Sequence, residues 1–239
     1  MSQITTQPLR YQAGETALSG TLVFPGDTTQ PLPGLVMAPN WMGVTANAEK
    51  LARKVAAAGY VVLLADLYGE TVRPTNTDEA GAAMMAVKNT PAEVGRMQAA
   101  IDALNSQAVV AVDSQKISAF GFCFGGHCAL ELARSGADLR AAISFHGGLD
   151  TCGEYDSTQI KAAILVLDGA KDPLVPREQL PAFVQEMTAV NVDWQLVSYH
   201  DAVHSFTDET ANNPGVAEYH PQVTERAFAS MFELLQRVN

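Results

Sequence analysis

The sequence predicts an α/β fold, in which a mostly parallel central sheet carries helices on both faces. Short apolar runs alternate with amphipathic stretches along the chain, the pattern of parallel strands joined by helices. A glycine-rich turn at 121–126 stands between one strand-like run and one helix-like stretch. Polar loops follow two later apolar runs, where the carboxyl ends of parallel strands gather reactive groups. Together these observations predict a site at that edge of the sheet.

The first half of the chain predicts three strands and three helices. Gly59 stands where a helix C-cap belongs, and Pro91 stands at the first turn of a helix. The run 18–24 is expected to be an early antiparallel strand. Buried strands are expected at 34–38 and 60–65, and helices at 46–58, 78–87 and 91–104.

The second half continues the same alternation. We find no internal repeat, low-complexity tract or linker, so residues 1–239 are expected to form a single domain. Strands are expected at 116–120, 140–145, 162–167 and 193–199, with helices at 127–134, 177–189 and 222–238.

Composition limits the class of protein. Of 239 residues, 47% are hydrophobic and 17% are charged, which predicts a globular chain. No apolar run reaches the roughly 18 residues of a membrane span, and the N-terminus lacks signal-peptide features. Three scattered cysteines do not make a disulfide framework, so a cytoplasmic location is expected. The net charge of −11 opposes nucleic acid and anionic membranes as partners. A small-molecule partner and a monomer or homodimer are expected.

The turn Gly121-Phe122-Cys123-Phe124-Gly125-Gly126 has the form of a nucleophile elbow. Glycines flank the central residue because the turn is too tight for side chains. The nucleophile would be the Cys123 thiol, and the following helix would present its N-terminal N–H groups to the sulfur. The alternative is a glycine-rich turn that holds a buried, inert cysteine.

An elbow requires an acid and then a histidine on later loops. Asp172 lies in the loop after 162–167, and His204 lies in the loop after 193–199. Both therefore occur in the required order. Asp168 and His200 end their strands, and Asp168 is expected to make structural hydrogen bonds.

Four segments together resemble the dienelactone hydrolase family. They are 121–126, Gly169-x-x-Asp172-x-x-Val175-Pro176, His204-Ser205-Phe206 and Asp66-Leu67-Tyr68. The resemblance extends from about residue 20 to the last helix. It implies the α/β-hydrolase fold, a triad of Cys123, Asp172 and His204, and no cofactor.

The resemblance also implies how these groups act. A free cysteine is only a few per cent thiolate at neutral pH, so His204 would take the Cys123 proton while Asp172 orients the imidazole. The backbone N–H groups of Phe124 and Trp41 would bind the oxyanion.

Two positions depart from the family pattern. Asn40 stands where the family has a glutamate, and an amide cannot take a proton, although it can hydrogen-bond the thiol sulfur or a substrate oxygen. Asp208 stands where the family has an arginine that binds the substrate carboxylate. Neutral activated esters or lactones are therefore the expected substrates. A phosphotriester is the alternative, and genuine carboxymethylenebutenolidase activity is a further one.

Aromatic and sulfur-containing side chains are candidate walls of an apolar substrate pocket, although core packing explains each of them equally well. They are Trp41, Tyr68, Phe124, Phe145 and Met84 or Met85.

Other readings are less well supported. His127, His146 and His200 lack the spacing of a metal site, so no metal is expected. A class I glutamine amidotransferase would need a late His-x-Glu pair, but this chain has His220-Pro221-Gln222. A binding protein on an inactive hydrolase fold also remains an alternative.

Overall fold

The computed structural model describes residues 3–239 and divides the chain into two compact units. The first unit ends at Ala119, and the second runs from Phe120 to Asn239. Each unit combines strands with covering helices. The expectation that residues 1–239 form one domain stays a prediction.

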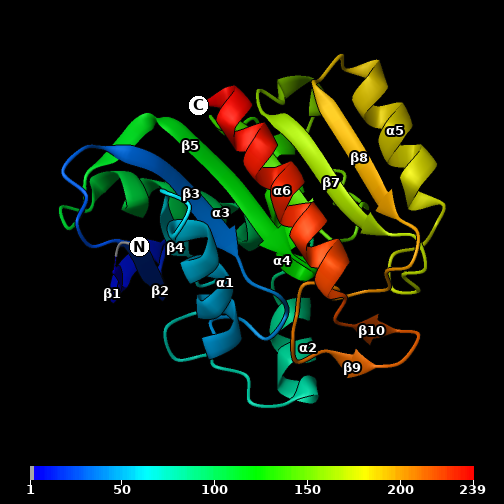
Figure 1. Cartoon of the computed structure of the whole chain (residues 1–239), viewed down its shortest axis with the longest axis horizontal. Helices are drawn as coiled ribbons and strands as arrows, with labels where there is room; N and C mark the ends of the chain where they lie inside the picture. The colour runs from blue at the N-terminus through cyan, green and yellow to red at the C-terminus, as the bar shows by residue number, and fades with distance from the viewer. Residues whose placement is uncertain (1–2) are drawn as a thin grey trace. The chain divides into compact units, whose positions relative to one another are not determined.

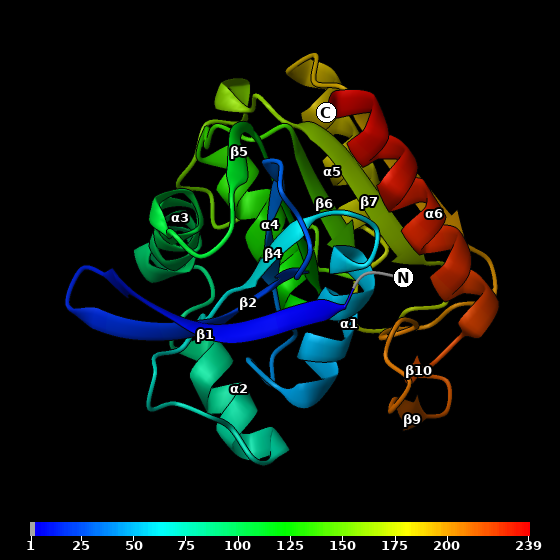
Figure 2. The same ribbon diagram turned by 60° about the vertical axis from the view of Figure 1, so that its left-hand side comes forward.

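The first unit is built on a long antiparallel strand pair, drawn in dark blue in Figure 2. β1 and β2 pair over ten residues, from Ile4 opposite Pro25 to Ala13 opposite Thr16. β2 pairs antiparallel with β4, whereas β3 pairs parallel with β4, and the strand order is β1-β2-β4-β3-β5. The elements are β1 (Ile4–Ala13), β2 (Thr16–Pro25), β3 (Leu32–Ala38), α1 (Ala46–Ala56), β4 (Val61–Leu64), α2 (Thr77–Met85), α3 (Pro91–Ser106) and most of β5 (Val112–Phe122).

The helices of this unit begin at the residues that their capping chemistry predicts. The Thr45 side chain accepts a hydrogen bond from the Ala48 N–H at the start of α1, and Pro91 opens α3. α1 packs on β2 and β4, while α3 packs on β1 and β3. All four residues of β4 are buried, as its uninterrupted apolar run predicts.

The second unit orders its parallel strands β6-β7-β8. α4 and α6 both pack on β6. Figure 1 shows α6, in red, in front of the strands of this unit, and Figure 2 labels α4 and α6 on either side of β6. The end of β5 leads into this unit. Its further elements are α4 (Phe124–Arg134), β6 (Ala141–Phe145), the 3₁₀ turn η1 (Ser157–Gln159), β7 (Ala163–Gly169), α5 (Gln179–Ala189), β8 (Trp194–Tyr199), β9 (Asn212–Asn213), β10 (Ala217–Glu218) and α6 (Pro221–Val238).

Most predicted elements are confirmed, with bounds that differ by a few residues. The antiparallel strand expected at 18–24 is β2, and Gly59 has the positive φ of +97° expected after a helix end. The sequence did not predict β1, η1, β9 or β10.

Successive loops of the second unit leave the carboxyl ends of neighbouring strands. Cys123 follows β5 and His146 follows β6, while Asp172 follows β7 and His204 follows β8. Because β6, β7 and β8 are parallel, their loops emerge at the same edge of the sheet.

Candidate active site

The chain reverses direction at Cys123 within a single residue. β5 ends at Phe122 and α4 begins at Phe124, and Cys123 between them has φ 55° and ψ −119°. The Cys123 N–H donates to the Phe145 carbonyl at 2.9 Å, which ties the turn to β6. At Gly126 a Cβ would lie 2.5 Å from Ser144 Oγ and 3.1 Å from the Gly147 Cα. Glycine is therefore required there for close packing of the helix start. The Cys123 side chain is half-buried.

Asp172 and His204, which are 32 positions apart, are joined by a short buried hydrogen bond. Asp172 Oδ2 lies 2.7 Å from His204 Nδ1. The other carboxylate oxygen, Oδ1, accepts from the backbone N–H groups of Leu174 at 2.8 Å and Val175 at 3.3 Å. These two donors fix the carboxylate, so that Oδ2 faces the imidazole.

The backbone at His204 is held by the segment that follows it. The His204 N–H donates to the Val216 carbonyl, and the His204 carbonyl accepts from the Glu218 N–H, both at 3.1 Å. β9 and β10 form the small antiparallel pair in this segment. The histidine therefore sits on a braced loop, although the loop contains little regular structure.

The charge of His204 is set by opposing influences. Burial disfavours its protonated form, but the hydrogen bond to Asp172 and the approach of Cys123 raise its pKa to about 10. Its second ring nitrogen, Nε2, is buried and makes no hydrogen bond of regular geometry with any residue in 3–239. One ring nitrogen, Nδ1, is therefore fixed by Asp172, and Nε2 is the nitrogen left for other partners.

Asp168 has the structural role that the sequence predicts. Arg177 donates to both of its carboxylate oxygens, at 2.9 and 3.1 Å, and Ser198 Oγ donates at 2.6 Å. Arg177 also donates to the carbonyls of Gly169 and Val175. Asp168 and Arg177 together clamp the loop that carries Asp172.

In the first unit, the loop after β3 is shaped by its own side chains. Asn40 Oδ1 accepts from the Met42 N–H at 3.0 Å, and the Tyr68 hydroxyl donates to the Trp41 carbonyl at 2.7 Å. Gly43 has a φ of +76°, and a Cβ there would lie 3.2 Å from Tyr68 Cδ2. Asn40 and Tyr68 therefore fix the conformation of residues 40–43.

The Asp66 carboxylate fixes the backbone at Tyr68. Its Oδ1 accepts from the N–H groups of Tyr68 and Gly69, both at 3.0 Å, while Oδ2 accepts from Ser19 and Arg73. The Asp66-Leu67-Tyr68 segment is therefore a structural turn that orients the Tyr68 ring.

The structure differentiates the expected pocket walls. Phe145 is fully buried, with its ring centroid 4.8 Å from that of Phe122 and 5.1 Å from that of Phe228. The Phe145 ring therefore packs in the core, and the expectation that it contacts substrate stays a prediction. Phe124 is also buried, whereas Met85 is 71% exposed and Trp41 is half-buried.

Asp208 turns at least one carboxylate oxygen toward its own loop. Its Oδ1 accepts from the Thr210 N–H at 2.8 Å and from the Thr210 hydroxyl at 2.7 Å. The side chain is half-buried. Its expected influence on substrate charge stays a prediction.

Sequence reasoning missed two polar residues beside the predicted triad. His146 and Thr207 are buried and lie 2.8 Å apart, from Nε2 to Oγ1. The His146 ring centroid is 5.1 Å from that of His204. A histidine directly after a strand was the only available signal, and it matches no catalytic motif.

The structure also bears on a metal site, on His220 and on membrane-spanning helices. In the part of the chain that the structure describes, no three His, Cys, Asp or Glu side chains are grouped to hold a metal ion. His220 caps α6, where its Nδ1 accepts from the Val223 N–H at 3.4 Å. No helix within residues 3–239 is long and apolar enough to cross a membrane.

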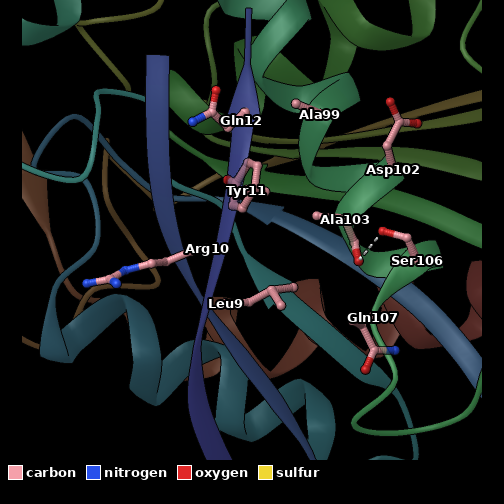
Figure 3. Close-up of a pocket in the computed structure, with 9 residues that line it drawn as sticks. All are labelled: Leu9, Arg10, Tyr11, Gln12, Ala99, Asp102, Ala103, Ser106 and Gln107. Carbon is pink, nitrogen blue, oxygen red and sulfur yellow. Dashed lines mark hydrogen bonds between the residues drawn. The ribbon is translucent and has the colours of Figure 1, made fainter. Parts of the chain in front are cut away.

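A cavity of about 410 Å³ lies along β1 and α3 in the first unit (Figure 3). Ser106 is in its lining, but its hydroxyl donates to the Ala103 carbonyl, and no histidine is present among the lining residues. This cavity therefore lacks the groups required for nucleophilic catalysis.

Comparisons with known proteins agree with the resemblance in the sequence. The chain matches the model of the dienelactone hydrolase family over residues 18–239. A solved structure named m3DLH is 36% identical, with 98% of each chain covered and a TM-score of 0.92. A dienelactone hydrolase-like promiscuous phosphotriesterase, P91, from metagenomic libraries is 35% identical, again with 98% of each chain covered and a TM-score of 0.91. A candidate carboxymethylenebutenolidase of Yersinia pestis is 28% identical over 76% of this chain and 71% of its own length.

Proposed function

Because the chain belongs to the dienelactone hydrolase family and is an ester or lactone hydrolase with the α/β-hydrolase fold, we propose that it uses Cys123 as a thiolate nucleophile. Asp172 and His204 complete the triad in this proposal. The substrates are neutral, activated carboxylic esters or lactones. No cofactor takes part, because protein groups supply the nucleophile, the base and the oxyanion donors.

The hydrogen bond of 2.7 Å between Asp172 and His204 is the observation that carries this proposal. It fixes the imidazole with Nδ1 toward the carboxylate, so that Nε2 is the nitrogen available for proton transfer. The influence of Cys123 on the pKa of His204 supports an ion pair between thiolate and imidazolium in the resting enzyme.

Acylation begins when the Cys123 thiolate attacks the carbonyl carbon of the ester. A carbon–sulfur bond forms, and the carbonyl π electrons move to oxygen to give an oxyanion. When the oxyanion collapses, the carbon–oxygen bond of the leaving group breaks. His204 donates its Nε2 proton to the departing alkoxide or aryloxide, and a thioester remains on Cys123.

Deacylation reverses these roles. Neutral His204 removes a proton from water, and the resulting hydroxide attacks the thioester carbon. The carbon–sulfur bond then breaks, so the carboxylic acid leaves and the thiolate–imidazolium pair is restored. Asp172 stabilises the imidazolium in both half-reactions without itself being protonated.

The backbone N–H groups of Phe124 and Trp41 are the proposed oxyanion donors. Each such donor contributes about 3 kcal/mol to transition-state stabilisation. Phe124 is the first residue of α4, so its N–H belongs to the positive end of that helix. The hydrogen bond from Tyr68 to the Trp41 carbonyl supports a fixed orientation of the loop that carries the second donor.

Asn40 changes how the thiol is activated compared with the family pattern. Because Asn40 Oδ1 accepts from the Met42 N–H, and because an amide cannot take a proton, no side chain at position 40 serves as the base. Direct proton transfer from Cys123 to His204 takes the place of a relay. A cytoplasmic location, which would keep the thiol reduced, is part of the same proposal.

A neutral substrate is favoured by the charge at position 208. The carboxylate of Asp208 would repel an anionic substrate that approached it. Carboxymethylenebutenolidase activity, which requires an anionic lactone, is therefore the less favoured carboxylic-ester alternative.

Phosphotriester hydrolysis is the second candidate function. A relative that is 35% identical over 98% of both chains is named a promiscuous phosphotriesterase. A neutral phosphotriester presents a phosphoryl oxygen that the same oxyanion donors would bind, and a thiolate can attack phosphorus. Hydrolysis of the phosphorylated cysteine would be the harder step.

The deciding experiment measures p-nitrophenyl acetate turnover by the wild type and by Cys123→Ala. We expect a burst of p-nitrophenol in the wild type, an acetyl group on Cys123 by peptide mass spectrometry, and no turnover above background in the variant. Thermal unfolding should be nearly unchanged, since the side chain is only half-buried. Retained turnover in Cys123→Ala would reject the assignment. Paraoxon in place of the ester tests the second candidate.

A further inference from the structure

His146 is a buried histidine that the proposed mechanism does not use. It follows β6 with a φ of +41°, which is rare for a residue with a Cβ, and its side chain is 2% exposed. Its N–H donates to the Leu167 carbonyl of β7 at 2.8 Å. The next residue, Gly147, packs so closely that a Cβ there would lie 2.8 Å from the Gly126 carbonyl carbon. The turn after β6 is thus pressed against the start of α4.

The ring of His146 contacts the elbow directly. The Cys123 N–H lies 3.2 Å from His146 Nδ1, and it also donates to the Phe145 carbonyl at 2.9 Å. An N–H can only donate, so Nδ1 must be the unprotonated, accepting nitrogen. The ring proton of neutral His146 is therefore on Nε2.

The Nε2 proton of His146 has one acceptor, the Thr207 hydroxyl oxygen at 2.8 Å. Thr207 is buried and lies three positions after His204, on the same loop. The His146 ring also packs edge to face on Phe206, with centroids 4.9 Å apart. One imidazole therefore connects the backbone of the elbow to the loop of His204.

The surroundings keep this connection intact. Burial and the nearby positive charge of His204 hold the pKa of His146 well below its usual value. A protonated ring would place an N–H on Nδ1 against the Cys123 N–H, where two donors would oppose each other. His146 therefore remains a neutral acceptor while His204 carries the charge.

We propose that His146 is a positioning residue that sets the approach of Cys123 to His204, acting through the Cys123 N–H and through Thr207. The proposal rests on the proposed thiol mechanism. In it, the Thr207 hydroxyl selects the His146 tautomer that carries its proton on Nε2. The same contact orients the peptide that precedes the Phe124 N–H. Small displacements of a nucleophile are costly, since about 1 Å can lower a rate about 100-fold.

The test uses Thr207→Val with Thr207→Ser as its matched control. Valine has the shape of threonine but lacks the hydroxyl, so the Nε2 proton of His146 loses its acceptor. Serine keeps the hydroxyl. For p-nitrophenyl acetate we expect Thr207→Val to lower kcat about tenfold with little change in KM, and Thr207→Ser to stay within about twofold of the wild type. His146→Asn keeps an acceptor near Nδ1 and tolerates positive φ, so it should lose less activity than His146→Gly.

Two readouts do not depend on turnover. The first is the iodoacetamide alkylation rate of Cys123 between pH 5 and 9, which should fall about tenfold at neutral pH in Thr207→Val and recover in Thr207→Ser. The second is the ¹⁵N spectrum of His146 in the wild type, which should show the proton on Nε2. A proton on Nδ1 in the wild type, or equal alkylation profiles for folded valine and serine variants, overturns the proposal.

These readouts separate the two hypotheses. If Cys123→Ala retained activity while alkylation of wild-type Cys123 still depended on the Thr207 hydroxyl, the thiol mechanism would fail, and with it the catalytic role of His146, although its contact with the Cys123 backbone would stand. If Cys123→Ala were inactive, but the Cys123 alkylation rate and the His146 tautomer did not depend on the Thr207 hydroxyl, the positioning role alone would fail.

Discussion

Asp172→Asn reverses the tautomer of His204, for a reason that is visible in the loop. Asp172 Oδ1 accepts from the N–H groups of Leu174 and Val175, while Oδ2 faces His204 Nδ1. An asparagine would keep its only oxygen on the two backbone donors, so its NH₂ would face the imidazole. Nδ1 would then have to accept, and the proton of the neutral ring would move to Nε2. Nε2 could no longer take a proton from thiol or water.

The magnitude follows from the opposite orientation of the amide. Turning the asparagine so that its oxygen faces His204 leaves the buried Val175 N–H without an acceptor, whereas Leu174 is exposed and its N–H can turn to water. An unsatisfied buried donor costs about 1–3 kcal/mol, so recovery of the working tautomer costs about 1–3 kcal/mol. At about 1.4 kcal/mol per factor of ten, kcat should fall between about fivefold and about 150-fold. The pKa of His204 should also fall, because the carboxylate that favours the imidazolium is gone.

The assay is the steady-state and burst kinetics of p-nitrophenyl acetate hydrolysis, with Asp168→Asn as the matched control. Asp168 ends the same strand, but its carboxylate is bound by Arg177 and Ser198. The control should lose about 1–3 kcal/mol of stability while kcat per folded enzyme stays within about threefold. A kcat for Asp172→Asn within threefold of the wild type would refute the tautomer argument. Equal losses in both variants would mean that loop stability, and not the imidazole, controls the rate.

Three further predictions concern charge and positioning. The pKa of His204 rises from 6.5 to about 10 on folding, so the stabilisation is complete below about pH 6.5 and is lost as the pH rises through about 10. The difference in unfolding free energy between the wild type and His204→Gln should therefore decrease between about pH 6.5 and 10, by at most about 1.4 kcal/mol per pH unit. A difference that stays constant from pH 6 to 10 contradicts this prediction. Asp208→Arg should raise kcat/KM for an anionic lactone relative to a neutral ester by about tenfold, whereas an unchanged ratio means that the side chain does not face substrate. Tyr68→Phe should lower kcat more than it raises KM, because the Trp41 carbonyl loses its donor. Tyr11→Phe removes a half-buried hydroxyl that bonds the Asp66 backbone, and it should affect stability alone. Equal kcat losses in the two variants would argue against a role for Tyr68 in the oxyanion loop.

β4 and β6 could be predicted from sequence because they are buried along their whole length. Such buried runs between turn residues have few other interpretations. β1 could not be predicted for the opposite reason. It is a polar strand at the end of the strand order, it alternates between half-buried and exposed positions, and it contains Pro8. Its ten-residue pairing with β2 is a tertiary contact that local preference does not reveal.

In the predicted site, too, some residues could be identified from sequence, whereas others are revealed only by their tertiary contacts. The proximity of Asp172 and His204 could be predicted because the strand order forces their loops to one edge, and the family resemblance selects them among neighbours such as Asp168 and His200. For Phe145 the sequence leaves two roles open, because an aromatic residue at a strand end suits a pocket and a core equally well. Its packing against Phe122 and Phe228 shows that the ring is part of the core. His146 could not be assigned, because its role depends on a positive φ and on a tautomer, and neither leaves a trace in sequence spacing.

His146 and His204 show how one environment produces two different histidines. Both rings are buried and their centroids are 5.1 Å apart, so burial alone would keep both neutral. A carboxylate faces Nδ1 of His204, whereas a backbone N–H faces Nδ1 of His146. Burial and the nearby charge of His204 lower the pKa of His146, whereas Asp172 and Cys123 raise the pKa of His204 despite its burial, so the two pKa values move in opposite directions. In the proposed mechanism, this division lets His204 carry the proton that leaves Cys123, while His146 accepts from the Cys123 backbone N–H without competing for that proton.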